Sequence, residues 1–150
     1  MISIRQATIG DKARVFELLK LLLTPSAGYT FDWSTATVLF REVVNNNEKG
    51  TILLAEQDGD AVGLITLSYP VAIRCRGLYS CIEEFIVSEK VRGKGVGTRL
   101  LEAAIAEATR KGCDEIQVNG PSELGYPVYI NQGFQDIGKH LKMKLPRQAT

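Results

Sequence analysis

RGKGVG, residues 92–97, separates an apolar segment that ends at Val87 from an alanine-rich segment that runs to Lys111. The apolar segment predicts a strand and the alanine-rich segment a helix, so the glycines occupy a strand-to-helix turn. Glycines leave backbone N–H groups unshielded, and a helix N-terminus offers unpaired donors and the positive end of its dipole. The stretch therefore predicts a loop that binds pyrophosphate.

Two common phosphate-binding loops fit this stretch poorly. A P-loop places its lysine directly after the last glycine, whereas Lys94 stands between two glycines. A dinucleotide fingerprint reads Gly-x-Gly-x-x-Gly after an earlier βαβ unit, and residues 93–97 read Gly-x-Gly-x-Gly. Asp114 lies at a suitable distance to bind a ribose, so a dinucleotide site stays an alternative. A turn without a ligand is another, although it needs one permissive residue rather than three.

Composition indicates an ordinary globular protein. A chain of 150 residues suits one domain, and a formal charge of +1 predicts no nucleic-acid partner. Cys75, Cys81 and Cys113 lack metal-ligand spacing, which predicts free thiols in a reducing cytoplasm and no bound metal. Neither a signal peptide nor a membrane-spanning segment is expected, because the longest apolar run, residues 18–23, is short and contains a lysine.

Hydrophobic periodicity predicts a mixed α/β (α+β) fold in the order β-α-α-β-β-β-α-β-α-β. This order predicts a central mixed sheet with helices on both faces, in which the first strands pair antiparallel. The first half is predicted to contain a strand over 2–7, a helix from Asp11 towards Pro25, a second helix capped by Ser34, and two strands over 51–56 and 61–67 joined by a turn at Asp58-Gly59. In the second helix, Val38, Leu39 and Val43 are expected to face inward. The second half is predicted to contain a strand over 78–87, a helix over 96–111 ended by Gly112, a strand over 115–118, a short helix over 127–132 and a strand over 134–145.

Three aromatic residues, Tyr29, Phe31 and Trp33, lie on the predicted loop between the first two helices. They are consistent with a hydrophobic lid over a substrate and equally with packing beneath the helices.

Residues 82–101, IEEFIVSEKVRGKGVGTRLL, resemble the central motif of the GNAT-superfamily N-acetyltransferases. That motif contains Arg/Gln-x-x-Gly-x-Gly/Ala, the acetyl-CoA pyrophosphate loop. Residues 126–134, YPVYINQGF, resemble the family's Phe-Tyr-x-x-x-Gly-Phe segment, and residues 4–11 resemble its first strand and helix start. The resemblance covers nearly the whole chain. It implies the same fold and direct transfer of an acetyl group from acetyl-CoA to a primary amine.

The resemblance also implies a set of cofactor contacts. Main-chain groups of the central strand lie beside the pantetheine and polarise the thioester, and backbone N–H groups and two basic side chains of the loop bind the pyrophosphate. Ser122 stands near the position where the family often has Asn-x-x-Ala, and it is a candidate to replace that amide contact. The residues concerned are Phe85, Ile86 and Val87 in the strand, Arg92, Gly93, Lys94, Gly95, Val96, Gly97 and Thr98 in the loop, and Ser122.

Glu83 and Glu84 are adjacent on a strand, so alternation places them on opposite faces and only one in the cleft. Family members with a Leu-Glu-Asp-type strand use the first acid as general base, often through water, which implies that role for Glu83. Glu84 then has a supporting or surface role. The alternative is that Glu83 is solvated or pairs with Arg74 or Arg76.

The family's tyrosine four residues before the glycine corresponds to Tyr129, which implies that Tyr129 protonates the leaving thiolate. A phenol with a pKa of about 10 stays protonated at neutral pH and can donate. The alternative is a core tyrosine with its hydroxyl at the sheet edge. His140, the single histidine, has no role in this mechanism.

The acceptor amine is not specified by these motifs. A small molecule is the expected acceptor, with the aromatic loop enclosing an apolar group and Arg74 or Arg76 pairing with a carboxylate. A protein or peptide amine is an alternative. A non-catalytic acyl-CoA-binding module is another, against which the presence of both Glu83 and Tyr129 argues. A homodimer is the commonest assembly for such a protein.

Overall fold

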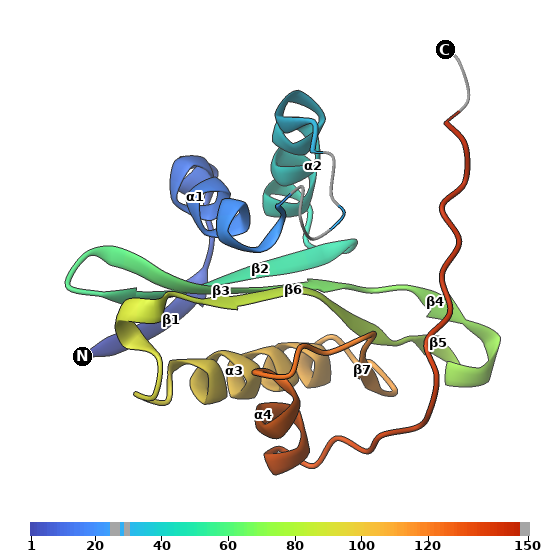
Figure 1. Cartoon of the computed structure of the whole chain (residues 1–150). Coiled ribbons are helices and arrows are strands. Elements are labelled where there is room, and N and C mark those ends of the chain that lie inside the picture. Colours follow the sequence, from blue (N-terminus) through green and yellow to red (C-terminus); the bar gives the residue numbers. More distant parts are fainter. Residues whose placement is uncertain (25–27, 29–30, 148–150) are drawn as a thin grey trace.

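The computed structural model describes residues 1–24, 28 and 31–147. Its centre is a five-stranded sheet in the order β1-β2-β3-β6-β7, and helices cover both faces (Figure 1). Helices α1 and α2 lie on one face, and α3 and α4 on the other. The predicted mixed fold is thereby confirmed. The elements are β1 (Ile2–Gln6), α1 (Lys12–Leu22), α2 (Trp33–Asn45), β2 (Gly50–Gln57), β3 (Asp60–Ser68), β4 (Val71–Ala72), β5 (Gly77–Leu78), β6 (Ser80–Val87), α3 (Val96–Arg110), β7 (Ile116–Val118) and α4 (Tyr126–Asn131), with 3₁₀ turns at Ile9–Asp11, Ile73–Cys75 and Glu89–Val91.

The predicted hairpin forms as β2 and β3, and its turn has the expected chemistry. Asp58 and Gly59 both have positive φ, 53° and 86°, which fits the right-handed twist of the paired strands. The pairs β1–β2, β2–β3 and β3–β6 are antiparallel, whereas β6–β7 is parallel.

Strands β6 and β7 stay paired for only a short distance. β7 pairs with Ser80–Ile82, whereas the second half of β6 pairs with β3 alone. Residues 83–87 therefore have main-chain groups on their β7 side that no described strand uses. The β3–β6 register also shifts between Thr66 and Leu67, which pair with Glu84 and Ile82 and leave Glu83 as the extra residue of a bulge.

Two apolar clusters bury the two faces of the sheet. Helix α3, which forms where a helix was predicted, packs on one face through an apolar stripe, of which Leu100, Leu101 and Ala104 are fully buried. Gly112, with a φ of 79°, follows the end of that helix as predicted. The opposite cluster joins α1 and α2 to the sheet through Val15, Leu18, Leu19, Phe40, Leu54 and Leu64.

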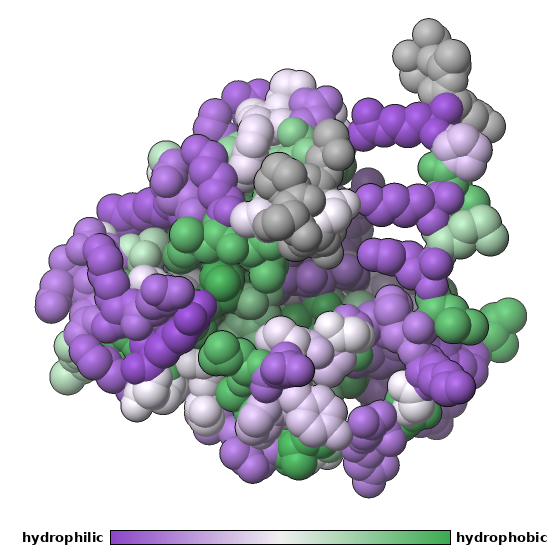
Figure 2. All heavy atoms as spheres, in the orientation of Figure 1, coloured by the Kyte–Doolittle hydropathy of each residue, from purple (hydrophilic) through white to green (hydrophobic). Residues whose placement is uncertain are grey.

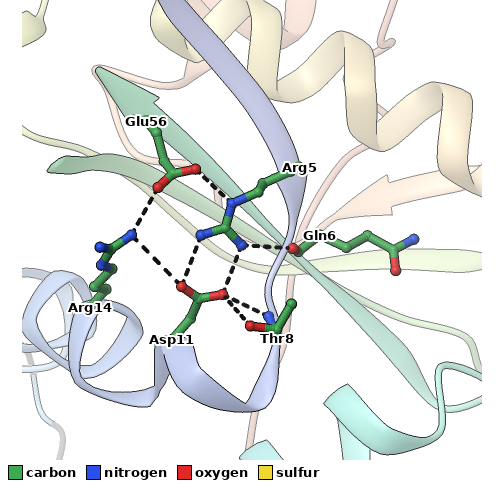
Figure 3. A network of polar contacts seen from close by, with 6 residues as sticks. All are labelled: Arg5, Gln6, Thr8, Asp11, Arg14 and Glu56. Carbon is green, nitrogen blue, oxygen red and sulfur yellow. Dashed lines mark hydrogen bonds and ion pairs between the residues drawn. The ribbon is translucent and has the colours of Figure 1, made fainter. Parts of the chain in front are cut away.

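A polar network joins β1 to α1 and β2 (Figure 3). The Arg5 guanidinium donates to both carboxylate oxygens of Asp11, at 2.8 and 2.9 Å, and to Glu56 at 2.6 Å. Asp11 also accepts from the Thr8 N–H at 2.7 Å, and Arg14 binds Glu56 at 2.8 Å. Asp11 was expected to cap α1. Asp11 does occupy the cap position, but its carboxylate makes no capping bond to the helix backbone; it binds Arg5 and Thr8, and it pairs with Arg14 of α1 at 3.9 Å.

Helix α2 differs from the prediction at its start and on its inner face. Asp32, not Ser34, is the cap, and its carboxylate accepts from the N–H groups of Ser34 and Thr35. The helix therefore begins at Trp33, before the expected start, and the side that faces the core differs from the expected one. Phe40 enters the core, whereas Val38 and Leu39 are exposed.

Two predicted strands are also changed. The expected strand over 78–87 is interrupted at Tyr79, because β5 turns away to pair with β4 after the positive φ values of Arg76 and Gly77. The last expected strand, over 134–145, is wrong: residues 134–147 have no helix or strand and extend away from the body beyond α4 (Figure 1). Alternation alone does not make a strand where no neighbouring strand pairs with it.

No described helix has the length and hydrophobicity to cross a membrane.

Candidate active site

A cavity of about 1160 Å³ extends from the start of α3, past β6, to the space between α1 and α2. Figure 2 shows the molecule hollowed between the layer that contains α1 and α2 and the layer that contains α3 and α4. All the residues predicted for catalysis and cofactor binding line this cavity except Lys94.

The N-terminus of α3 leaves several donors free at one end of the cavity. The first intrahelical bond runs from the Arg99 N–H to the Gly95 carbonyl at 3.1 Å, so the N–H groups of Val96, Gly97 and Thr98 precede it. Gly95 is the cap, has a φ of 79° and has no side chain to bind these donors. Such an end fits a pyrophosphate.

The two basic side chains of the loop are arranged differently. The Arg92 Nε donates to the Val87 carbonyl at 3.3 Å, and its guanidinium pairs with Glu89 at 3.4 Å. Arg92 thus ties the loop to the end of β6. Lys94 is exposed and makes no ion pair with any described residue.

The free edge of β6 supplies main-chain groups beside the loop. Phe85, Ile86 and Val87 bond to β3 on one side only, so their other side faces the gap left by β7. The helix start packs closely on this strand, because a Cβ placed on Gly97 would lie 3.6 Å from Phe85 Cζ. An extended amide-containing chain such as pantetheine fits this edge.

Glu83 and Glu84 both line the cavity, so the expectation that only one does is wrong. The bulge at Glu83 breaks the alternation on which that expectation depended. Glu83 is exposed and accepts a hydrogen bond from the Ser68 hydroxyl at 2.7 Å. Glu84 is more buried, and its N–H donates to Thr66 Oγ1 at 3.0 Å. Burial raises the pKa of Glu84, and the neighbouring charge of Glu83 adds to the rise.

Tyr129 is only 4% exposed and lies on α4 against β6. Its ring packs edge-on against Phe85 at 5.8 Å between centroids, and against Phe134 at 5.3 Å. The hydroxyl makes no hydrogen bond with any described residue. Burial raises the pKa of Tyr129 well above its ordinary value, and negative charge at Cys81 has the same effect. The phenol is therefore a protonated donor at the wall of the cavity, and no residue that the structure describes accepts its proton.

Other predicted contacts have mixed outcomes. Ser122 lines the cavity, but its Oγ accepts from the Gly125 N–H at 3.0 Å. Arg74 and Arg76 pair with Glu115 and Asp114, not with Glu83, and they do not line the cavity.

The structure also bears on the predicted aromatic loop and on the alternative of a dinucleotide site. Phe31 lines the cavity, whereas Trp33 packs on Phe16 with 4.9 Å between centroids. Tyr29 lies outside the described residues. Asp114, the ribose candidate of a dinucleotide site, is not at the cavity.

Sequence reasoning missed several polar residues of the site, among them Lys49, Thr66, Ser68 and Asn119. Thr66 and Asn119 line the cavity, the first opposite Glu84 and the second directly after β7. Asn119 could have been predicted from its place after a strand, because polar residues at the carboxyl end of a parallel strand commonly face a ligand. Among the described residues, no group of three or more His, Cys, Asp or Glu could hold a metal ion.

Comparison with known proteins gives a consistent result. A model of the acetyltransferase (GNAT) family matches residues 15–134. Glucosamine 6-phosphate N-acetyltransferase 1 of Oryza sativa subsp. japonica is 28% identical over 147 residues, which is 95% of this chain and 85% of that protein.

Solved structures share the fold. A predicted acetyltransferase from Clostridium acetobutylicum, solved with acetyl-CoA, has a TM-score of 0.80 and 24% identity over 96% of each chain. Glucosamine-6-phosphate N-acetyltransferase from Arabidopsis thaliana has a TM-score of 0.81 and 20% identity, over 97% of this chain and 99% of that one. Since the family model spans both the pyrophosphate loop and Tyr129, the chain belongs to the GNAT family and is an acetyl-CoA-dependent N-acetyltransferase.

Proposed function

We propose that this acetyltransferase modifies the primary amine of a small molecule. The observation that carries the proposal is the continuity of the cavity, which extends from the α3 N-terminus past β6 and ends between α1 and α2. A partly enclosed space of this kind fits a small acceptor better than a shallow surface groove would. The rice relative is named for a small-molecule acceptor, which supports the same class.

Acetyl-CoA supplies the acetyl group as a thioester, and transfer forms an N–C bond while the C–S bond breaks. The N–H groups of Val96, Gly97 and Thr98 bind the pyrophosphate, with charge from Arg92 and Lys94. The free main-chain edge at Phe85, Ile86 and Val87 orients the pantetheine and polarises the carbonyl, and the Ser122 hydroxyl donates to the cofactor. The N–H groups of Val96, Gly97 and Thr98 support this assignment because they precede the first intrahelical bond of α3, and residues 85–87 support it because no described strand pairs with them on the β7 side.

Two proton transfers complete the reaction. Glu83 accepts the proton of the amine, directly or through water, and its exposure at the cavity gives it access to both. Tyr129 donates its hydroxyl proton to the departing thiolate. The raised pKa of Glu84 favours that residue as the competing base, because a carboxyl with a higher pKa is the stronger proton acceptor.

The experiment compares Glu83→Gln with Glu84→Gln in an assay of CoA thiol release with a panel of small amines and lysine-containing peptides. Glu83→Gln should lower turnover by about 10²-fold at neutral pH, with partial recovery at higher pH as more amine arrives unprotonated. The larger loss in Glu84→Gln would transfer the base role to Glu84. Acetylation of peptides alone would refute the small-molecule acceptor.

We further propose that the chain forms a homodimer through its C-terminal segment, residues 135–147. Ile137, Leu141, Met143 and Leu145 in this segment are at least 79% exposed, and the last three alternate with Lys142 and Lys144. Such alternation is typical of a strand that buries one face. Figure 1 shows the segment as a trace outside the two layers, and Lys144 contacts the body by donating to the Gly28 carbonyl at 3.1 Å.

A second copy is the proposed partner, because the apolar row has the pattern of a strand and its own sheet leaves it unpaired. Light scattering should give the dimer mass for the parent protein and the monomer mass for Met143→Glu, while Lys142→Glu keeps the dimer. A monomeric parent would refute this assembly.

A reducing, cytoplasmic location is proposed on the free thiols. All three cysteines are unpaired, and burial raises the pKa of each. Cell fractionation with an antibody to the chain tests the location.

A further inference from the structure

The end of the cavity between α1 and α2 has an apolar wall. Phe16 and Leu22 of α1 and Leu23 just after it line the cavity on one side, and Leu39 and Val43 of α2 line it on the other. Phe31, just before α2, adds an aromatic ring. Figure 2 shows hydrophobic side chains gathered along the hollow on this side of the molecule.

The α2 part of this wall is a helical stripe that adjoins the core face. Ala36, Leu39 and Val43 recur at i, i+3 and i+7 and share one side of the helix, and the buried ring of Phe40 also borders the cavity. Leu39 is 54% exposed although it lines the cavity. An apolar occupant would remove this side chain from water, which is favourable in proportion to the area covered.

Few charges lie along the cavity, and they are unevenly placed. Among its described lining residues the charged ones are Lys49, Glu83, Glu84 and Arg92. Lys49 pairs with Glu42 at 3.9 Å, and Arg92 belongs to the pyrophosphate loop. The two carboxylates lie on β6, between the loop and the apolar end.

This distribution of charged and apolar side chains favours an acceptor with an ammonium group at one end and an apolar body at the other. An ammonium group gains from the two carboxylates as it approaches β6, and an apolar body gains from the wall between the helices. A phosphate or a polyhydroxyl body at the apolar end would lose hydration, and Lys49, which pairs with Glu42, is the one charged donor among the described lining residues outside the pyrophosphate loop.

We infer that the acceptor is a primary amine with an apolar alkyl or aryl body, which occupies the pocket formed by Phe16, Leu22, Leu23, Phe31, Leu39 and Val43. The inference rests on the proposed small-molecule acceptor and narrows its class. It distinguishes this chain from the rice relative, whose name specifies a sugar phosphate.

The experiment measures kcat/KM at saturating acetyl-CoA for straight-chain primary amines of increasing length, for phenethylamine and for glucosamine 6-phosphate. Each methylene that enters the pocket should raise kcat/KM by about fourfold, from the transfer free energy of a CH₂ group, until the pocket is filled. Phenethylamine should exceed glucosamine 6-phosphate by at least about 10²-fold.

Two neighbouring substitutions locate the effect. Leu39→Gln places an amide in the wall and should lower kcat/KM for hexylamine and phenethylamine by about tenfold, with little change for methylamine. Val38→Gln is the matched control, since Val38 is 55% exposed on the same helix and does not line the cavity. It should leave every acceptor unchanged.

The outcomes separate this inference from the proposed function. Preference for glucosamine 6-phosphate, or no dependence on amine length, overturns the apolar pocket but leaves a small-molecule acetyltransferase. Equal effects of the two glutamine variants overturn the pocket as well. Acetylation of peptides with none of the small amines overturns both.

Discussion

Tyr129→Phe is the substitution that separates chemistry from folding most cleanly in this site. The change removes one oxygen and keeps the ring that packs between Phe85 and Phe134. The hydroxyl makes no hydrogen bond with a described residue, so its loss leaves no protein group unpaired. The free energy of unfolding should therefore change by less than about 0.5 kcal/mol.

Turnover should fall much further than stability. Loss of a positioned acid costs about 10²- to 10⁴-fold, or about 2.7 to 5.4 kcal/mol in barrier height. The affinity for acetyl-CoA should change little, because the donor matters as negative charge develops on sulfur. Since the pKa of Tyr129 is raised, the parent should show no loss of turnover from its ionisation near pH 10.

The assay follows CoA thiol release in single turnovers, beside thermal unfolding of the same preparations. Tyr126→Phe is the matched control, because Tyr126 is exposed, donates to Asp136 at 3.1 Å and does not line the cavity. An acyl donor with a more acidic thiol should narrow the gap between Tyr129→Phe and the parent. Near-parental turnover of Tyr129→Phe, with chemistry limiting the rate, would show that the tyrosine is a packing residue only.

Three further changes test the loop, the β1 network and the buried acid. Gly95→Val should cost about 1–3 kcal/mol, because a β-branched residue is strained at a φ of 79°, and thermal shifts should show that CoA no longer stabilises it. Asp11→Asn should cost about 2–3 kcal/mol in urea unfolding. Arg5 holds the pKa of Asp11 well below its usual value, so the parent keeps this contribution above about pH 4 and loses it on further acidification, and the variant should lack that loss. Glu84 has a raised pKa, so its ionisation weakens the fold as pH rises, and Glu84→Gln should melt no lower than the parent at pH 8.

The sequence predicted those parts of the fold that local chemistry determines. The Asp58-Gly59 hairpin and the stripe of α3 need only turn residues and helical periodicity, and both are confirmed. The glycine turn before α3 was also readable, and its role as a pyrophosphate loop stays a prediction. The sequence could not determine which acid or hydroxyl caps α2, since Asp32 and Ser34 are both competent cap residues.

The C-terminal segment shows a different limit. Leu141, Met143 and Leu145 have the alternation of a strand, and the structure leaves them exposed without a neighbouring strand. The alternation indicates that the apolar face of this segment is buried against a partner, but it does not identify the partner. That information lies in another chain or another segment, and we propose a second copy of this chain as the partner.

The glutamate pair shows why active sites resist sequence reasoning even when every residue is identified. Strict alternation of side chains along β6 would place only one of the two glutamates at the cavity. With the bulge at Glu83, both glutamates line it. A bulge depends on the register of β3 against β6, which has no local signal in either strand. Its consequence is chemical: two carboxylates share one cavity, and the charge of Glu83 raises the pKa of its buried neighbour. An ammonium that approached this pair would be attracted by both carboxylates, so the same irregularity supports the proposed acceptor site, with Glu83 as the proposed base.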